Sequence, residues 1–169
     1  WEHSLSCAVS ARCIAQQKKM KEPEEVSICA LLHDIGKAIV MLQYPAEYEQ
    51  ILGKAEKLGI SLYDAEKKLL AATHAEVGLW LAQKWRFPPN LVEAIGFHHQ
   101  PQSARQAPLE TSIVHVSDIL VRARGVGFAG DYFVPAVHPA AWDMLRLSDE
   151  EIRTVLIQVE DSVSSGEEN

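Results

Sequence analysis

The chain has 169 residues, of which 47% are hydrophobic and 23% are charged, the composition of a globular domain. This length predicts one domain with a core of its own, because domains usually span about 100–200 residues. The net charge of −7 argues against binding along a DNA or RNA backbone, which basic side chains drive. No hydrophobic run approaches the roughly 18 residues that a membrane-spanning helix needs, and no secretory signal opens the chain, so we expect a cytoplasmic protein without membrane contact.

Helical periodicity recurs along the whole chain, whereas the alternation typical of strands is nearly absent. The sequence therefore predicts an all-α fold, a compact multi-helix bundle in one domain over residues 1–163, followed by a disordered polar tail over 164–169. The predicted helices cover approximately residues 1–19, 23–33, 36–43, 45–58, 61–72, 74–85, 89–99 and 109–124, with a last helix after Ser148. Thr73 with Glu76, and Ser148 with Glu151, have the spacing of capping boxes. Residues 125–139 contain several Gly and Pro residues and are expected to be irregular.

Three cysteines, Cys7, Cys13 and Cys29, are odd in number and lack a CxxC spacing. This pattern favours neither a disulfide framework nor a zinc site built from thiolates. We expect reduced thiols that pack as small apolar side chains.

The most informative feature is the doublet of His33 and Asp34, because it offers an imidazole and a carboxylate from neighbouring positions. Five more residues of ligand type fall in predicted helices, mostly on apolar faces: His3, His74, His98, His99 and Asp118. A single histidine on such a face is more often a hydrogen-bonded core residue than a ligand. Asp118 is harder to explain in this way, since a buried carboxylate must be paired, and Arg122 one turn later is the alternative partner. Inward polar groups on five helices together favour a metal site.

Histidine and carboxylate ligands suit iron or manganese, which we favour, and also nickel, cobalt or zinc, rather than calcium or magnesium. The set is large enough for two ions if Asp34 bridges them, and two ions could activate a water for hydrolysis of a phosphoester. Asp34 and Lys37 are the predicted catalytic residues, with Lys37 offering its charge to a substrate phosphate or, alternatively, lying in solvent. His115 either hydrogen-bonds a ligand or lies in the core or at the surface, and His138 has no assigned partner.

The pattern of these residues resembles that of the HD superfamily of metal-dependent phosphohydrolases. The motif sequences are most similar to those of the HDOD group, the HD-related output domains of bacterial signalling proteins. The motifs are Trp1-Glu2-His3-Ser4, Leu31-Leu32-His33-Asp34-Ile35-Gly36-Lys37, His74-Ala75-Glu76-Val77-Gly78, Trp85-Arg86-Phe87-Pro88-Pro89 and His98-His99-Gln100-Pro101. The resemblance implies a helical domain with metal ligands at His3, His33, Asp34 and Asp118. In members with two metals, the set extends to positions matching His74, His98 and His99.

Three departures limit what the resemblance implies. Cyclic-di-GMP phosphodiesterases of the HD-GYP type have a Gly-Tyr-Pro loop where this chain has Gln100-Pro101-Gln102-Ser103. Alarmone hydrolases have a Glu-Asp pair where this chain has Gly36-Lys37. Both activities are therefore disfavoured. HDOD proteins also usually have a helical lobe before the first histidine, so we expect either that one is missing upstream of Trp1, which we favour, or that this is a minimal version of the domain.

Two functions remain. The favoured one is a metal-binding domain of a bacterial signal-transduction protein, which would have a signalling protein as its partner. The alternative is an active metal-dependent phosphohydrolase that cleaves a nucleotide or another phosphorylated small molecule.

Overall fold

Helices make up the regular structure of residues 1–166, the part of the chain that the computed structural model describes, with side chains up to residue 164. Their bounds are Glu2–Gln17 (α1), Pro23–Leu32 (α2), Ile35–Gln43 (α3), Pro45–Leu58 (α4), Leu62–Leu69 (α5), His74–Lys84 (α6), Pro89–Phe97 (α7), Pro101–Ser103 (η1, a 3-10 helix), Pro108–Arg124 (α8), Pro139–Leu145 (α9) and Asp149–Gly166 (α10). No strand occurs in this range, so the predicted all-α fold is confirmed.

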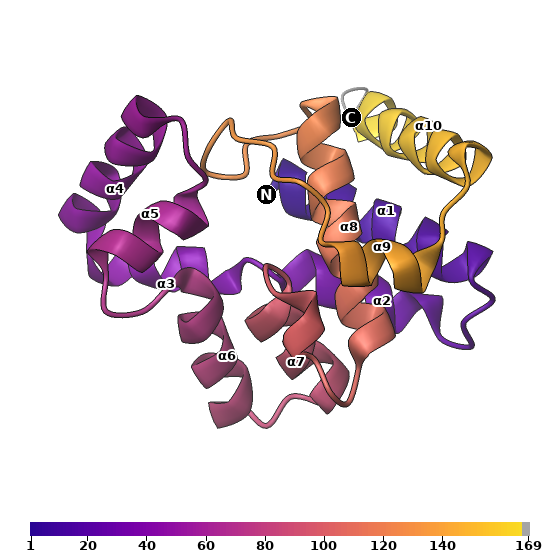
Figure 1. The fold of residues 1–169 in the computed structure, drawn as a ribbon, viewed down its shortest axis with the longest axis horizontal. Helices are drawn as coiled ribbons and strands as arrows, with labels where there is room; N and C mark the ends of the chain where they lie inside the picture. The colour runs from indigo at the N-terminus through magenta and orange to yellow at the C-terminus, as the bar shows by residue number, and fades with distance from the viewer. Residues whose placement is uncertain (167–169) are drawn as a thin grey trace.

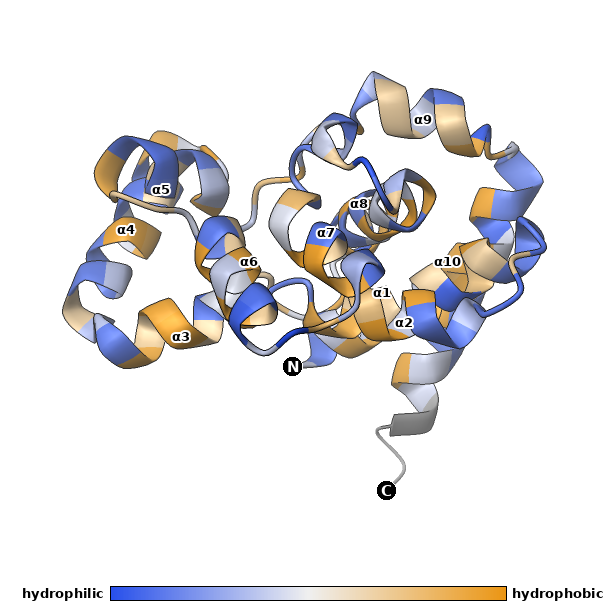
Figure 2. Cartoon of the chain, turned by 90° about the horizontal axis from the view of Figure 1, so that it is seen from below, coloured by the Kyte–Doolittle hydropathy of each residue, from blue (hydrophilic) through white to orange (hydrophobic). Residues whose placement is uncertain are grey.

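The main core surrounds α8, which runs through the middle of the molecule (Figure 1). Seen from below, α8 has α7, α1, α10 and α9 around it, with hydrophobic residues on the facing sides (Figure 2). Cys7, Ala11 and Ile14 repeat at helical spacing on the buried face of α1, and Ile113 and Val121 are fully buried on α8. Because apolar burial drives packing, these faces fix α1 against α8 and thereby bring His3 opposite Asp118.

A smaller apolar cluster holds α3, α4 and α5 together in a lobe beside the main core (Figure 1). Gly36, near the start of α3, lies so close to α6 that a Cβ at this position would be 1.9 Å from the carbonyl oxygen of His74. Only glycine allows this approach of the two backbones. The glycine of the His-Asp motif therefore brings the start of α3, next to Asp34, against the start of α6.

The connection between α8 and α9 reaches across to the α4–α5 lobe and returns (Figure 1). Asp131 anchors it, because its Oδ1 accepts from Arg122 Nη1 at 3.1 Å and its Oδ2 accepts from the Leu62 amide at 2.8 Å. The segment is irregular up to its last residue, as expected, but α9 was not predicted. His138 explains that helix, since its Nδ1 accepts from the Ala140 amide at 3.2 Å and caps the first turn.

Several predicted helix ends agree with the structure. Thr73 and Glu76 form a reciprocal capping box at the start of α6, and Ser148 and Glu151 exchange the corresponding bonds before α10. Helix α5 ends at Leu69, three residues before the predicted end. Helix α10 continues to Gly166, so it includes residues 164–166 of the predicted tail, and residues 167–169 lie outside the described residues. Among the described helices, none combines the length and the apolar character needed to cross a membrane.

Candidate metal centre

All seven predicted ligand residues converge in one interior region. His3 comes from α1, His33 and Asp34 from the junction of α2 and α3, His74 from the start of α6, His98 and His99 from the end of α7, and Asp118 from α8. Their potential ligand atoms form two groups, and within each group these atoms lie within 4.8 Å of one another. The first group contains His3, Cys7, His33 and Asp118, and the second contains Asp34, His74, His98 and His99.

The first group centres on Asp118 Oδ1. His3 Nε2 lies 3.0 Å from this oxygen and His33 Nε2 lies 3.9 Å from it. Cys7 Sγ is 3.5 Å from the same nitrogen of His3. All four side chains are buried.

The second group centres on Asp34 Oδ1, which lies 3.4 Å from His74 Nε2 and 3.6 Å from His98 Nε2. His99 Nε2 is 3.0 Å from His74 Nε2. The other oxygen of Asp34, Oδ2, lies 3.3 Å from His33 Nε2 of the first group. Asp34 thus presents one oxygen to each group.

The ring orientations of His33 and His98 suit a metal. Nδ1 of His33 donates to the Ala30 carbonyl at 2.6 Å, and Nδ1 of His98 donates to the Ile95 carbonyl at 2.9 Å. The proton is therefore on Nδ1, and Nε2 has a free lone pair. In both rings Nε2 is buried without a hydrogen-bond partner, as is Asp34 Oδ1. Buried acceptors without donors are costly, so a divalent cation fits the set chemically.

The electrostatics favour ionised carboxylates at Asp34 and Asp118 and a neutral imidazole at His98, the forms that bind metals. Burial opposes ionisation of Asp118, yet the Arg122 guanidinium holds the pKa of Asp118 well below its usual range. Burial also opposes ionisation of Asp34, but His33 and Lys37 lower its pKa well below the usual range. Burial lowers the pKa of His98 to about 4.

Burial and neighbouring charges also shift the pKa values of His99, His33 and Cys7. Burial, followed by the charge of His98, lowers the pKa of His99 well below its usual value. Burial acts in the same direction on His33, but the Asp34 carboxylate outweighs it and raises the pKa of His33. Burial and the charge of Asp118 raise the pKa of the Cys7 thiol.

The ion pair considered for Asp118 is present together with the histidine contacts. Arg122 Nε donates to Asp118 Oδ1 at 2.8 Å, and its Nη1 reaches Asp131. The guanidinium thus lies between two carboxylates and keeps Asp118 Oδ1 directed at the first group. Sequence reasoning posed the ion pair and the ligand as alternatives, whereas one carboxylate serves in both contacts.

Lys37 has a different neighbourhood from the one expected for a phosphate contact. Its Nζ donates to Asp34 Oδ2 at 2.6 Å and to the Ala129 carbonyl at 2.7 Å. The ammonium thereby joins the doublet to the connection between α8 and α9. His115, the other residue left open, is buried and donates from Nδ1 to the His98 carbonyl at 2.6 Å, while its Nε2 accepts from the His138 amide at 2.9 Å.

Sequence reasoning missed Glu66 and the position of Cys7. Glu66 is fully buried, and its Oε2 accepts from His74 Nδ1 at 2.6 Å and from the His74 amide at 2.9 Å. The signal for Glu66 was a carboxylate one turn from Leu62 and Leu70, on the apolar face of its helix. Cys7 had a similar signal, since it follows His3 by one helical turn.

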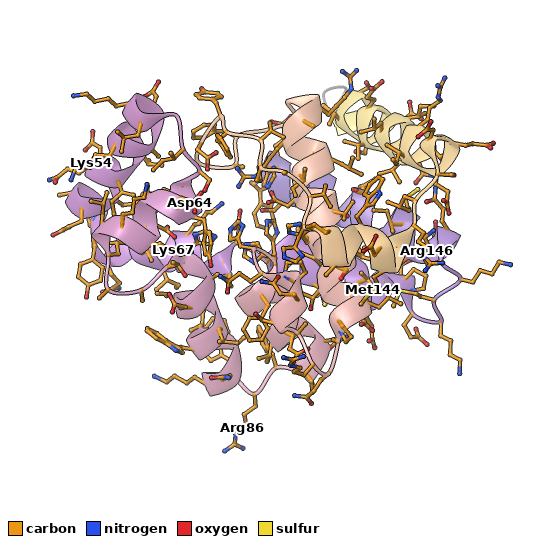
Figure 3. All side chains as sticks on the ribbon, viewed as in Figure 1. Lys54, Asp64, Lys67, Arg86, Met144 and Arg146 are labelled. Atoms are coloured by element: carbon orange, nitrogen blue, oxygen red, sulfur yellow. The ribbon has the colours of Figure 1, made fainter. Side chains whose placement is uncertain are left out.

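A cavity of about 410 Å³ adjoins both groups between α5, α8 and the segment before α9. Its lining includes Lys67, His99, Asp118 and Arg122. Tyr63 stacks on the ring of His99 with centroids 4.3 Å apart, and Lys67 Nζ lies over the Tyr63 ring, 5.3 Å from its centroid. Figure 3 shows Lys67 on α5, in the lobe beside the main core. The cavity therefore brings charged side chains of both signs and an aromatic wall next to the candidate ligands.

The HDOD domain family matches residues 1–101 of the chain. The chain belongs to the HDOD family. The predicted resemblance is thereby confirmed, and the match covers every predicted ligand except Asp118.

Relatives of this HDOD domain include ribonuclease Y of Mycoplasmoides gallisepticum, which is 33% identical over 132 residues, 76% of this chain and 20% of that protein. The HDOD domain spans about a fifth of the length of the curated relatives it matches. Among solved structures, an HDOD domain protein of Geobacter sulfurreducens has a TM-score of 0.78 at 27% identity, over 98% of this chain and 59% of that chain. A candidate signal transduction protein of Marinobacter aquaeolei has a TM-score of 0.79 at 19% identity, over 97% of this chain and 36% of that chain, and shares the fold.

Proposed function

We propose that this HDOD domain is a metal-binding module of a bacterial signalling protein, with one divalent ion at each of the two groups and Asp34 between them. The observation that supports it most directly is the set of unpaired buried acceptors, His33 Nε2, His98 Nε2 and Asp34 Oδ1. In both histidines the other ring nitrogen, Nδ1, donates to a backbone carbonyl, which leaves Nε2 as the acceptor. Without a cation, burial of these acceptors would cost folding free energy that no hydrogen bond offsets.

The two groups call for different supporting residues. Asp118 is oriented by Arg122, and His74 is oriented by Glu66, which also increases the electron density on the imidazole. Lys37 holds Asp34 Oδ2. We assign these three residues to positioning the ligands, and we favour iron or manganese for the second group, with its three imidazoles and one carboxylate.

The signalling role is supported by the family to which the domain belongs and by the shared fold of a protein whose name places it in signal transduction. In this role the metals would lock the relative positions of α1, α3, α6, α7 and α8. A partner protein would then bind the surface of a rigid helical assembly.

A second candidate is a metal-dependent phosphohydrolase, and the specific observation in its favour is the cavity beside the ligands. Bound divalent ions would lower the pKa of a water and polarise a phosphoester. Lys67 would place positive charge near the phosphate, and Tyr63 would offer a face to an aromatic group. The relation to a ribonuclease makes a phosphodiester the bond class to test first.

Elemental analysis after anaerobic reconstitution with iron, manganese, nickel, cobalt or zinc tests the proposal. We expect about two ions per chain for the native protein and a loss of at least one ion for Asp34→Ala. His138→Asn is the matched control, because asparagine can still cap α9 and the residue lies outside both groups. A folded native protein that retains less than a tenth of an ion of every metal would exclude the metal-binding function.

Turnover separates the two candidates. The metal-loaded protein is assayed against a nitrophenyl phosphodiester, cyclic dinucleotides and a short RNA, with Asp34→Ala as the inactive reference. Hydrolysis by the native protein that disappears in this variant supports the enzyme. Metal binding without hydrolysis of any substrate leaves the signalling module as the function.

A further inference from the structure

We propose that Cys7 is a thiolate ligand, which makes the first group a mixed nitrogen, oxygen and sulfur site for a zinc-type ion. The inference rests on the proposed metal-binding function and goes beyond it, because the resemblance to the HD superfamily assigns no cysteine to the site. Two imidazoles, a carboxylate and a thiolate form a four-ligand set of the kind that zinc takes in proteins. The second group has no sulfur, so the two halves of the centre differ in chemistry.

Local helix geometry places Cys7 at the site. His3 and Cys7 are four residues apart on α1, and side chains at this spacing lie on the same face. Cys7 Sγ is 3.5 Å from His3 Nε2, and it lies within 4.8 Å of the ligand atoms of His33 and Asp118. The thiol therefore faces the interior of the group and does not merely border it.

The distances between ligand atoms agree with a tetrahedral centre. Zinc lies about 2.0–2.3 Å from nitrogen, oxygen and sulfur ligands, so the edges of its tetrahedron measure roughly 3.3–3.7 Å. The separations between ligand atoms in the first group are 3.0 Å for His3 to Asp118, 3.5 Å for His3 to Cys7 and 3.9 Å for His33 to Asp118. These three values bracket the expected edge, and all four ligand atoms lie within 4.8 Å of one another.

Charge balance supports a thiolate at this position. With neutral imidazoles, the charges of Cys7 and Asp118 together offset one divalent ion. Arg122 adds one positive charge, and its second carboxylate partner, Asp131, removes it. Asp34 and Lys37 neutralise each other, so the groups counted here are then neutral, whereas a protonated Cys7 would leave a net charge of +1 on them.

The other cysteines lack this setting. Cys13 Sγ accepts from Gln17 Nε2 at 3.8 Å, and Cys29 packs in the apolar core on α2. Neither belongs to a group of ligand residues in the described part of the chain. They provide internal controls for the chemistry of Cys7.

The difference in donors predicts different metal preferences. Thiolate ligands favour zinc over the harder ions, so the first group would retain zinc. The second group, with three imidazoles and one carboxylate, would accept iron or manganese. We infer a centre with one zinc-type ion and one ion of the iron or manganese type.

Cobalt spectroscopy of the full chain tests the thiolate directly. Apo-protein is titrated with Co²⁺ without oxygen, and we expect a sulfur-to-cobalt charge-transfer band in the near ultraviolet. Cys7→Ser should lose this band but keep the visible bands of cobalt bound elsewhere, and Cys13→Ser should keep both. Zinc affinity of the first group should fall at least tenfold in Cys7→Ser, because even the loss of a residue that only supports a ligand costs about 10–100-fold.

A second measurement does not depend on any variant. X-ray absorption of the native protein loaded with one equivalent of zinc should show a sulfur neighbour at about 2.3 Å. Metal bound without a sulfur neighbour or a charge-transfer band would overturn the thiolate and leave the metal-binding function intact. A native protein that binds no metal would overturn both.

Discussion

Glu66 offers a quantitative test of how the centre is supported from within the fold. Its carboxylate is fully buried, and Oε2 accepts two bonds from one residue, at 2.6 Å from His74 Nδ1 and at 2.9 Å from the His74 amide. Glu66→Ala removes the acceptor of both donors. Glu66→Gln keeps an oxygen of similar position and removes only the charge.

The magnitude follows from the two donors. A buried donor left without a partner costs about 1–3 kcal/mol, so two cost about 2–6 kcal/mol. Oε1 of Glu66 is buried without a partner, and its removal returns part of that cost. We therefore expect Glu66→Ala to lose about 2–4 kcal/mol of unfolding free energy. For a chain of this size, 1 kcal/mol corresponds to about 2–4 °C, which gives a fall in Tm of about 4–16 °C.

Two assays separate stability from metal binding. Thermal unfolding of the apo-protein measures the stability cost, with Glu49→Ala, at an exposed position on α4, as a control expected within about 0.5 kcal/mol of the native protein. Competition with a chelator measures affinity at the second group. We expect Glu66→Gln to bind metal about 10–100-fold more weakly, because the uncharged amide makes the His74 imidazole a poorer ligand.

The two variants should differ in a defined way. Glu66→Gln should lose less stability than Glu66→Ala, since its oxygen can still accept from His74 Nδ1. An apo-protein with Glu66→Ala that unfolds within 2 °C of the native protein would refute the argument that these two bonds orient His74.

Three further predictions concern the scaffold. Gly36→Ala should destabilise the protein by about 2–3 kcal/mol in urea unfolding, because the added Cβ would meet the His74 carbonyl. Gly53→Ala, where a Cβ would have no atom within 4 Å, should instead stabilise α4 by up to about 1 kcal/mol. Equal effects of the two variants would contradict the close approach of α3 and α6. The backbone N–H groups of residues 105–107 donate to the Glu93 carboxylate at 2.7–3.0 Å. Glu93→Gln should therefore lower the free energy of unfolding by about 1–3 kcal/mol and speed amide hydrogen exchange at these residues. Unchanged exchange would show that Glu93 does not anchor this segment. Burial raises the pKa of Cys29 to about 12, so the thiolate is scarce at pH 8. Alkylation of Cys29 by iodoacetamide, followed by mass spectrometry, should therefore be at least about 100-fold slower in the folded protein than in urea-unfolded protein. Equal rates would disprove this prediction.

Local signals predicted much of the fold. The helix starts at Thr73 and Ser148 were readable because a capping box involves residues three positions apart and needs no distant partner. The start of α9 was missed because its cap is a histidine, His138, which is not among the usual N-cap residues. The end of α5 was placed three residues late, since residues 70–72 continue the helical composition, whereas the backbone of Leu70 is already extended.

Local spacing also predicted part of the candidate site. Periodicity could place His74 and Asp118 on inward faces, because a helix repeats every 3.6 residues whatever surrounds it. Periodicity carries no information on which inward faces meet. The division into two groups, the position of Asp34 between them and the carboxylate of Glu66 behind His74 all depend on contacts between separate helices.

The sequence by itself determined the helical class, most helix boundaries, the seven ligand-type residues and the membership in the HDOD family, because each depends on local spacing or on motifs. Only the tertiary structure decided that Cys7 joins His3, that Arg122 and Asp118 pair beside the histidines, and that Lys37 contacts Asp34 and the Ala129 carbonyl. The physical reason is that packing of apolar faces sets the distances between helices, and ligand chemistry depends on those distances to within about an ångström.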